Sequence, residues 1–461
     1  MNVLLLSTYE LGHQPLAVAR PAAHLIAAGF DVRCQDLSVE PLDETLVREA
    51  TLVGISVPMH TATRLGARVA ERVRALNPGC HIAFYGLYAS LHADVLIGAS
   101  ADSAIGGEFE EPLVRLACAL SANGASRTAT LDGVRASGSD GGTFLGRQVF
   151  ELPRRDLLPP LERYARVDTG AGQQKLVGYV EASRGCAHRC LHCPITPVYN
   201  GRLRVVGADV VLQDIGQLVQ MGAEHITFGD PDFFNGIRHS LRIVEAMHEA
   251  FPRLTFDATI KVEHILEHRP HIPTLAAAGC LFIVSAVEAV HDHILANFQK
   301  GHTAADVDTA LAIADAAGIP LRPTFVAFTP WTTLIDYLEL VEFILQRDLV
   351  RHVDPVQLVI RLLVPRGSSL IGTPAMDPFL GPFNPTTFSH GWQHPDPRVD
   401  RLQERVAAVV ERGARESADP ESVFTRIHEL ASAAVGRSVA PGVASGRPPR
   451  AVPRLTEPWF C

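Results

Sequence analysis

The sequence predicts an α/β protein with a doubly wound, Rossmann-like parallel sheet at its amino-terminal end, a partial (β/α)6 barrel in its middle, and a helical extension with a flexible tail. Two observations predict this class. Short apolar runs alternate with helical patterns before residue 121 and again after residue 175, as parallel strands joined by crossover helices do. The chain has 461 residues, too many for one core, so several domains are expected.

Changes in composition divide the chain into four parts. These are a first α/β unit at 1–121, a linker at 122–174, the barrel at 175–378 and the extension at 379–461. The linker begins with a run rich in Gly, Ser, Ala and Thr, and continues with prolines and leucines. We expect its second half, 152–167, to lie extended across the domain junction.

The first unit is predicted to be a parallel sheet. Its strands are expected at residues 3–6, 32–34, 52–55 and 82–84, with helices at 16–28, 63–76 and 110–120. Ligands of such sheets bind at the carboxyl ends of the strands. Two of these ends fall at Gly86 and Gly106.

The barrel is predicted from six further β/α units. Strands are expected at residues 176–180, 225–228, 254–259, 281–286, 321–328 and 356–363, with helices at 208–221, 240–250, 272–278, 303–317 and 334–347. In barrels of this kind the chemistry gathers at the carboxyl ends of the strands. In the extension, helices are expected at 398–415 and 421–435, and the Pro-, Gly-, Ser- and Arg-rich run at 440–453 is expected to be flexible.

Charge and hydropathy limit the partners of the protein. The net charge of -9 and the pI near 6.1 disfavour nucleic acid as a main partner, because no basic stripe could neutralise phosphates. No apolar run reaches the roughly 18 residues that a membrane helix needs, and the start of the chain lacks a signal peptide. We therefore expect a cytoplasmic protein with no membrane partner.

The most informative motif is a loop with three cysteines, Cys186, Cys190 and Cys193, spaced at i, i+4 and i+7. Cysteine thiolates hold cuboidal iron-sulfur clusters. With no fourth cysteine nearby, one iron of a 4Fe-4S cube would stay open, as at a catalytic metal site. Two alternatives remain: a zinc site that recruits His188 or His192, and an iron-sulfur electron carrier. Either would make the chain a non-catalytic metal-binding or electron-transfer protein.

This loop resembles the signature of the radical S-adenosylmethionine (radical SAM) superfamily. The resemblance implies that SAM occupies the open iron, and that one electron cleaves it to methionine and a 5'-deoxyadenosyl radical. It also implies a small-molecule substrate and an external electron donor of the flavodoxin or ferredoxin type.

The same resemblance implies roles for residues after the barrel strands. Asp230 and Asp232 stand where the superfamily binds the methionyl ammonium; the alternative is an Asp-Pro turn with a helix N-cap. Glu288 is expected to bind the ribose hydroxyls, and His192 to lie near the adenine. Thr324 is expected in the wall of the pocket.

The first unit resembles the cobalamin-binding domain of one radical SAM class, with the run Gly106-Gly107-Glu108-Phe109-Glu110 similar to that class's closing Gly-Glu-x-Glu turn. This implies a cobalamin near Gly86 and Gly106 and, with it, methyl transfer. Two departures stand against it: the chain lacks an Asp-x-His-x-x-Gly motif, and the bulky Tyr88 follows Gly86. A sheet kept as a scaffold without cobalamin is the alternative.

The end of the chain, Glu457-Pro-Trp-Phe-Cys461, resembles the radical SAM family named for its Cys-Sec-Ala-Glu-Pro or Cys-Cys-Ala-Glu-Pro tail. The resemblance implies a catalytic, redox-active Cys461 on a mobile tail. There the Cys461 thiol and the selenol of a following selenocysteine would form a strained bridge, and strained exposed bridges are easily reduced. An inert terminal cysteine is the alternative.

Because UGA encodes selenocysteine and ordinary translation reads it as a stop, we predict that a Sec-Ala-Glu-Pro end is missing after Cys461. Sequencing the gene beyond the Cys461 codon checks this. Any codons other than TGA followed by Ala, Glu and Pro would defeat the prediction.

Overall fold

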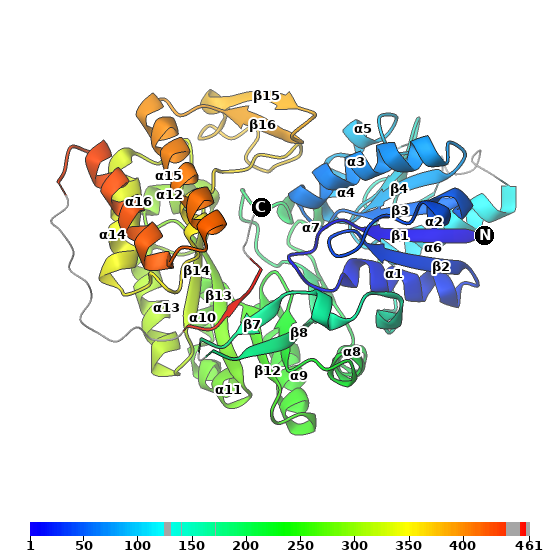
Figure 1. Ribbon diagram of the computed structural model, residues 1–461, viewed down its shortest axis with the longest axis horizontal. Helices are drawn as coiled ribbons and strands as arrows, with labels where there is room; N and C mark the ends of the chain where they lie inside the picture. The colour runs from blue at the N-terminus through cyan, green and yellow to red at the C-terminus, as the bar shows by residue number, and fades with distance from the viewer. Residues whose placement is uncertain (124–130, 140, 171, 439–451, 458–461) are drawn as a thin grey trace.

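The computed structural model describes residues 1–123, 131–139, 141–170, 172–438 and 452–457. Two sheets dominate the molecule: a six-stranded sheet in the amino-terminal part and a seven-stranded curved sheet in the middle part. They lie side by side, with the last two long helices on the far side of the second sheet (Figure 1). The predicted α/β class is confirmed.

The amino-terminal sheet has the strand order β2-β1-β3-β4-β5-β6, and its first five strands are parallel. The strands are β1 (Asn2–Ser7), β2 (Asp31–Asp36), β3 (Leu52–Ser56), β4 (His81–Tyr85), β5 (Ser103–Ile105) and β6 (Val134–Ala136). The helices are α1 (Leu16–Ala27), α2 (Glu44–Glu49), α3 (His60–Leu76), α4 (Leu87–Leu91), α5 (Ala93–Leu96) and α6 (Glu110–Asn123). Apolar side chains of β1 point to both faces, Leu4 and Leu6 into one core and Val3 and Leu5 into the other. Burial on both faces is typical of a doubly wound sheet.

The first unit extends beyond the boundary predicted at residue 121. Strand β6 pairs antiparallel with β5, and the side chain of Val134 is fully buried in the same core. The Gly- and Ser-rich composition around β6 concealed this edge strand, because a three-residue strand has no measurable periodicity.

The segment that crosses between the sheets includes two 3-10 turns, Arg155–Leu157 and Leu161–Arg163. Arg155 is buried, and its guanidinium makes a two-pronged ion pair with Asp214 of the second sheet's first crossover helix, at 3.0 and 2.9 Å. The same guanidinium donates to the backbone oxygen of Gln14 in the first unit, at 3.4 Å. One buried cation therefore holds the crossing segment to both units.

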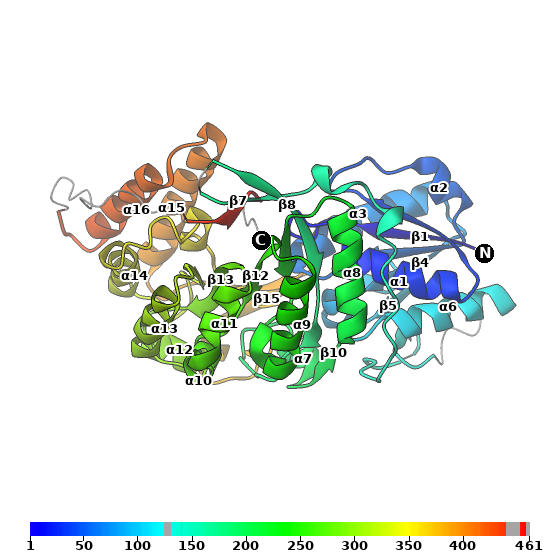
Figure 2. The same ribbon diagram turned by 90° about the horizontal axis from the view of Figure 1, so that it is seen from below.

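The second sheet has the order β14-β13-β12-β11-β8-β7-β17. Five strands are parallel, β8 (Gln174–Val180), β11 (His225–Phe228), β12 (Thr255–Thr259), β13 (Cys280–Glu288) and β14 (Leu321–Phe325), and β7 (Arg166–Asp168) pairs antiparallel with β8. Its helices are α8 (Ala208–Gln220), α9 (Ile237–Ala250), α10 (Val262–Glu267), α11 (Ile272–Ala277), α12 (Asp292–Phe298), α13 (Ala304–Ala316) and α14 (Leu334–Gln346). Figure 2 shows α8, α9 and α11 side by side over the outer face of this half-barrel.

The strand predicted at 356–363 is wrong. The chain instead forms a 3-10 turn at Pro355–Leu358 and a single bridge between Phe328 and Arg361. Proline has no N–H to donate to a ladder, and the Gln357 side chain accepts the N–H of Phe325 at 3.1 Å. The Gln357 side chain thus binds the Phe325 N–H at the edge of the sheet, which a sixth strand would otherwise have bound.

The extension contains the two predicted helices, α15 (Pro397–Glu416) and α16 (Pro420–Ala434), and a hairpin that was not predicted, β15 (Leu380–Asn384) with β16 (Ser389–Trp392). This hairpin reaches the first unit: His60 Nε2 lies 2.7 Å from the backbone oxygen of Thr387, and the ring of Phe388 packs edge-on to His92. None of the helices in the described ranges is long and apolar enough to cross a bilayer.

Candidate active site

Two residues separate the end of strand β8 from the short strand β9 (Ser183–Gly185), which pairs with β10 (Leu203–Val205), and the cysteine loop follows β9 directly. Gly185 has a φ of +74°, and a Cβ there would lie 2.3 Å from the backbone oxygen of Arg202. Only glycine therefore permits this turn into Cys186. The seven cysteines among the described residues all carry free thiols.

The three motif thiols suit a metal cluster. Burial, with smaller contributions from Cys190 and Cys186, raises the pKa of Cys193 to about 12. A thiol of this kind stays protonated until a metal displaces the proton. Three soft sulfur donors on one loop fit an iron-sulfur cube.

Neither histidine of the loop is positioned as a zinc ligand beside these thiols. His192 Nε2 lies 3.1 Å from Glu288 Oε1. His188 lies with Nε2 3.5 Å from Asp232 and Nδ1 3.1 Å from the Lys261 ammonium. The zinc alternative on the three cysteines is disfavoured because, among the described residues, the group around His188 that could hold a metal ion consists of His188, Asp232 and His264 and contains none of these thiols.

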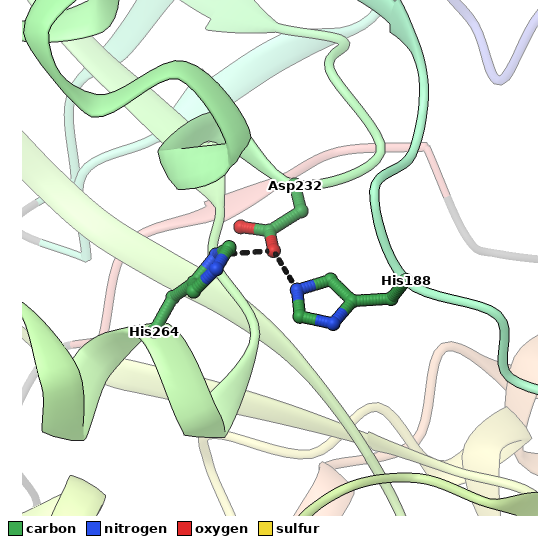
Figure 3. Close-up of side chains that lie close together, drawn as sticks. All are labelled: His188, Asp232 and His264. Atoms are coloured by element: carbon green, nitrogen blue, oxygen red, sulfur yellow. Dashed lines mark ion pairs between the residues drawn. The ribbon is translucent and has the colours of Figure 1, made fainter. Parts of the chain in front are cut away.

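Asp232 lies between two imidazoles, as Figure 3 shows. Its Oδ2 is 2.7 Å from His264 Nδ1 and 3.5 Å from His188 Nε2, and its Oδ1 accepts the Phe234 N–H at 3.2 Å. Although burial opposes ionisation, the two histidines hold the pKa of Asp232 well below its usual range. The N-cap interpretation of Asp232 is thus correct, and its predicted role on SAM stays a prediction.

Asp230, two residues earlier, binds the turn between β8 and β9. It accepts hydrogen bonds from the Ala182 N–H at 2.9 Å and from the Ser183 hydroxyl. Burial raises the pKa of Asp230 to about 7, and the hydrogen bonds only partly counteract this effect. The carboxyl group therefore fixes the entry to the cysteine loop.

Glu288 ends β13 and binds two side chains. Its Oε1 lies 3.1 Å from His192 Nε2 and 3.2 Å from the ammonium of Lys300. The His192 ring also packs on Phe298, at 4.3 Å between ring centroids. Thr324 lies beside Ala286 on the neighbouring strand β14. Sequence reasoning did not single out Lys300, because nothing local marks it as buried.

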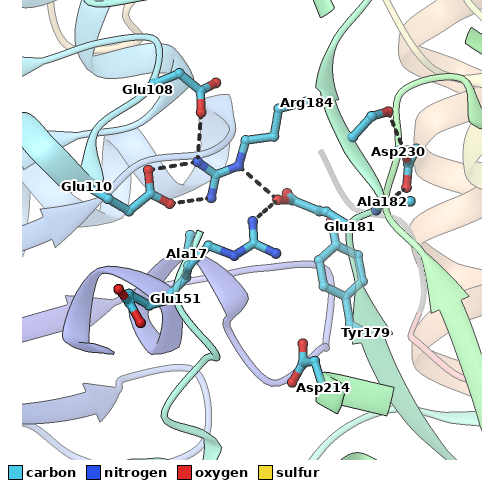
Figure 4. Close-up of polar contacts among 12 residues, drawn as sticks. Ala17, Glu108, Glu110, Glu151, Tyr179, Glu181, Ala182, Arg184, Asp214 and Asp230 are labelled. Atoms are coloured by element: carbon cyan, nitrogen blue, oxygen red, sulfur yellow. Dashed lines mark hydrogen bonds and ion pairs between the residues drawn. The ribbon is translucent and has the colours of Figure 1, made fainter. Parts of the chain in front are cut away.

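The guanidinium of Arg184 links the cysteine loop to the amino-terminal sheet (Figure 4). It lies 2.6 Å from Glu110 and 3.5 Å from Glu108, both in the Gly-Glu-x-Glu-like turn, and 2.9 Å from Glu181. Glu181 in turn pairs with the buried Arg20 at 2.9 Å. Sequence analysis missed this network, whose members are up to 164 positions apart.

The two glycine turns named for cobalamin are packed against the chain itself. A Cβ at Gly106 would lie 2.2 Å from Ser90 Cβ, and one at Gly86 would lie 3.2 Å from the backbone oxygen of Val57. Tyr88 is buried, with its ring near His60 and His92. The two glycines thus allow close packing around α4, and the cobalamin predicted near them stays a prediction.

Cys461 lies outside the described residues. The segment before it is docked: β17 (Arg454–Leu455) pairs antiparallel with β7, and the Thr456 N–H donates to the Arg166 oxygen at 2.8 Å. Glu457 Oε1 accepts the Tyr9 hydroxyl at 3.0 Å. This segment therefore reaches from the second sheet to the carboxyl end of β1.

Comparisons with known proteins agree with this geometry. Residues 180–344, from the end of β8 through α14, match the family model described as the radical SAM superfamily. A curated relative, assigned as a methylthiotransferase in Methanocaldococcus jannaschii, is 22% identical over 188 residues, 38% of this chain and 41% of that protein. This chain thus matches about two fifths of that relative's length.

Two solved structures share the fold. OxsB, a cobalamin-dependent SAM radical enzyme solved with aqua-cobalamin, has a TM-score of 0.70 at 14% identity, covering 94% of this chain and 71% of OxsB. TsrM of Kitasatospora setae, a radical SAM methyltransferase solved with tryptophan and a SAM analogue, has a TM-score of 0.59 at 19% identity, covering 75% and 71%. The predicted resemblance to the radical SAM superfamily is thus confirmed for residues 180–344. The narrower family defined by its tail stays a prediction.

Proposed function

We propose that this protein uses a 4Fe-4S cluster on Cys186, Cys190 and Cys193 to cleave SAM reductively and modify a small-molecule substrate. The observation that carries the proposal is the set of three free thiols on one loop at the carboxyl end of β8, within the region that matches the radical SAM superfamily. When bound, the cluster would supply the electron that generates a 5'-deoxyadenosyl radical from SAM.

Side chains at the ends of the neighbouring strands would hold SAM. Glu288 would accept hydrogen bonds from the ribose hydroxyls, with His192 beside the adenine and Thr324 in the wall of the pocket. Asp230 and Asp232 would act near the methionyl ammonium, chiefly by fixing the loops that surround it. These roles are supported by the contacts that both carboxylates already make: Asp230 with the Ala182 N–H, and Asp232 with the Phe234 N–H and His264.

The partners proposed are a small molecule and an external electron donor. A net charge of -9 favours a substrate that is not a nucleic acid, since phosphate backbones require basic surfaces. The electron would come from a flavodoxin- or ferredoxin-type protein.

A second candidate function is methyl transfer assisted by cobalamin. It is favoured by the likeness of 94% of the chain to OxsB, which was solved with aqua-cobalamin bound, and of 75% of the chain to TsrM, a methyltransferase. The close packing around Gly86 and Gly106 opposes it.

We also propose that the Cys461 thiol exchanges an electron or a hydrogen atom at the active site. Strand β17 is antiparallel to β7, which is antiparallel to β8, so the docked segment runs in the direction of β8, whose end leads to the cysteine loop (Figure 2). Cys461 follows Glu457 by four residues, a reach of up to about 14 Å.

The cluster proposal predicts that anaerobically reconstituted protein binds iron and sulfide and, with a reductant, forms 5'-deoxyadenosine from SAM. Replacing Cys186, Cys190 and Cys193 by Ala should abolish both properties, because each thiolate is a cluster ligand. Cys118→Ala, at an exposed free cysteine, is the matched control. Metal binding without SAM cleavage would favour the electron-carrier alternative, and SAM cleavage by the triple variant would refute the proposal.

The second candidate predicts that the apoprotein takes up hydroxocobalamin. After incubation with excess corrinoid and gel filtration, the visible spectrum of the protein peak should show about one corrinoid per chain. A protein peak without corrinoid absorbance would rule cobalamin out and leave the amino-terminal sheet as a scaffold.

The tail proposal predicts an isotope result. A hydrogen atom passed from the Cys461 thiol to the 5'-deoxyadenosyl radical breaks the S–H bond, forms a C–H bond and leaves a thiyl radical. Because thiols exchange with solvent, 5'-deoxyadenosine formed in D2O should carry deuterium, and Cys461→Ser should lose it while Cys118→Ser should not. Equal deuterium content in all three proteins, measured by mass spectrometry, would contradict the proposal.

A further inference from the structure

Lys300 is a buried cation beside the cysteine loop. Only 5% of the residue is exposed, and its ammonium donates to Glu288 Oε1 at 3.2 Å. Burial alone would lower the pKa of Lys300, but Glu288 and the nearby sulfur atoms of Cys190 and Cys193 raise it above its usual value. Burying an unpaired ammonium is unfavourable, and the pair with Glu288 offsets this cost for Lys300.

Unusual backbone geometry sets up the Glu288–Lys300 pair. The register of β13 with β14 shifts between Ala286 and Glu288, and Glu288 has a φ of +70°. Bulges re-aim side chains, and a left-handed glutamate is a strained conformation of the kind found at functional sites. In this conformation the Glu288 carboxylate contacts His192 of the cysteine loop.

The other half of the pair is tied directly to the same loop. The Leu191 N–H donates to the backbone oxygen of Phe298, the last residue of α12, at 2.9 Å. Gln299 then takes a φ of +50°, and Lys300 follows. Movement of the cysteine loop away from Lys300 would break this link.

The charges around Lys300 come from each element packed against it. Glu288 of β13 attracts it, as Cys190 and Cys193 of the loop would in their deprotonated, metal-bound form. Burial lowers the pKa of His302 to about 4, with Lys300 and Lys261 adding to the shift, so that imidazole is neutral near pH 7. Lys261 lies on the other side of Gly301 and is paired with Glu263 at 2.6 Å. Lys300 is therefore a buried cation beside the cysteine loop, paired with Glu288.

We propose that Lys300 is a positioning residue that raises the reduction potential of the cluster, with Glu288 holding its ammonium in place and moderating its field. The inference rests on the proposed function, because it needs a cluster on the three cysteines. One electron from the external donor adds one negative charge, and no bond forms or breaks in that step. A fixed cation favours the more negative state, since charge near a cluster sets its potential.

The test is a redox titration of the reconstituted holoenzyme without SAM, followed by electron paramagnetic resonance. Lys300→Met removes the cation at nearly constant volume and should disfavour reduction about tenfold, which is about 59 mV toward negative potential for one electron. Glu288→Gln removes the opposing charge and should shift the potential in the positive direction. Lys300→Arg keeps the charge and should stay near the wild-type value.

Lys175→Met is the matched control, because Lys175 lies at the start of β8, at the opposite end of the strand from the cysteine loop. An unchanged potential in Lys300→Met, or shifts of the same sign in Lys300→Met and Glu288→Gln, would overturn the inference. If Lys300→Met holds no cluster, the sign of the Glu288→Gln shift decides. Absence of a cluster in the wild type would instead refute the proposed function.

Discussion

One buried guanidinium, that of Arg184, joins the cysteine loop to the amino-terminal sheet, and the arrangement of the two sheets depends on it. Arg184 stands two residues before Cys186 and lies among Glu108, Glu110 and Glu181. A buried charge that loses its partners costs several kcal/mol, on the order of 3–5 for a broken pair. The distance between the sheets therefore cannot change without exposing charges or displacing the loop.

The same principle recurs at the strand ends around the loop. Asp230 binds the turn before it, Asp232 binds His188 within it, and Glu288 binds His192 within it. Carboxylates after two strands of the second sheet, β11 and β13, which have β12 between them, thus fix one loop. A loop held in this way keeps its geometry without a ligand, and such preorganisation lowers the ordering cost of any binding.

Much of the fold could be predicted from local pattern, and most of the site's interactions could not. The runs at 225–228 and 208–221 are apolar in the right period, and they form β11 and α8 within one residue of the expected bounds. The run at 356–363 is also apolar, but a strand needs a neighbouring strand to pair with. Here the side chain of Gln357 accepts the Phe325 N–H of β14, which a sixth strand would otherwise have bound. Lys300 and Arg184 were missed as pair members because pairing depends on tertiary distance, whereas the cysteine spacing is a local property.

The hydrogen bond between Tyr9 and Glu457 spans 448 positions of the chain. At ribosomal rates of about 5–20 residues per second, Glu457 appears roughly 20 to 90 s after Tyr9. The amino-terminal sheet must therefore persist during synthesis with the end of β1 uncovered, and the edge of β7 must wait unpaired for β17. Open edges of this kind attract other strands, so the nascent protein has an interval in which chaperones would matter most.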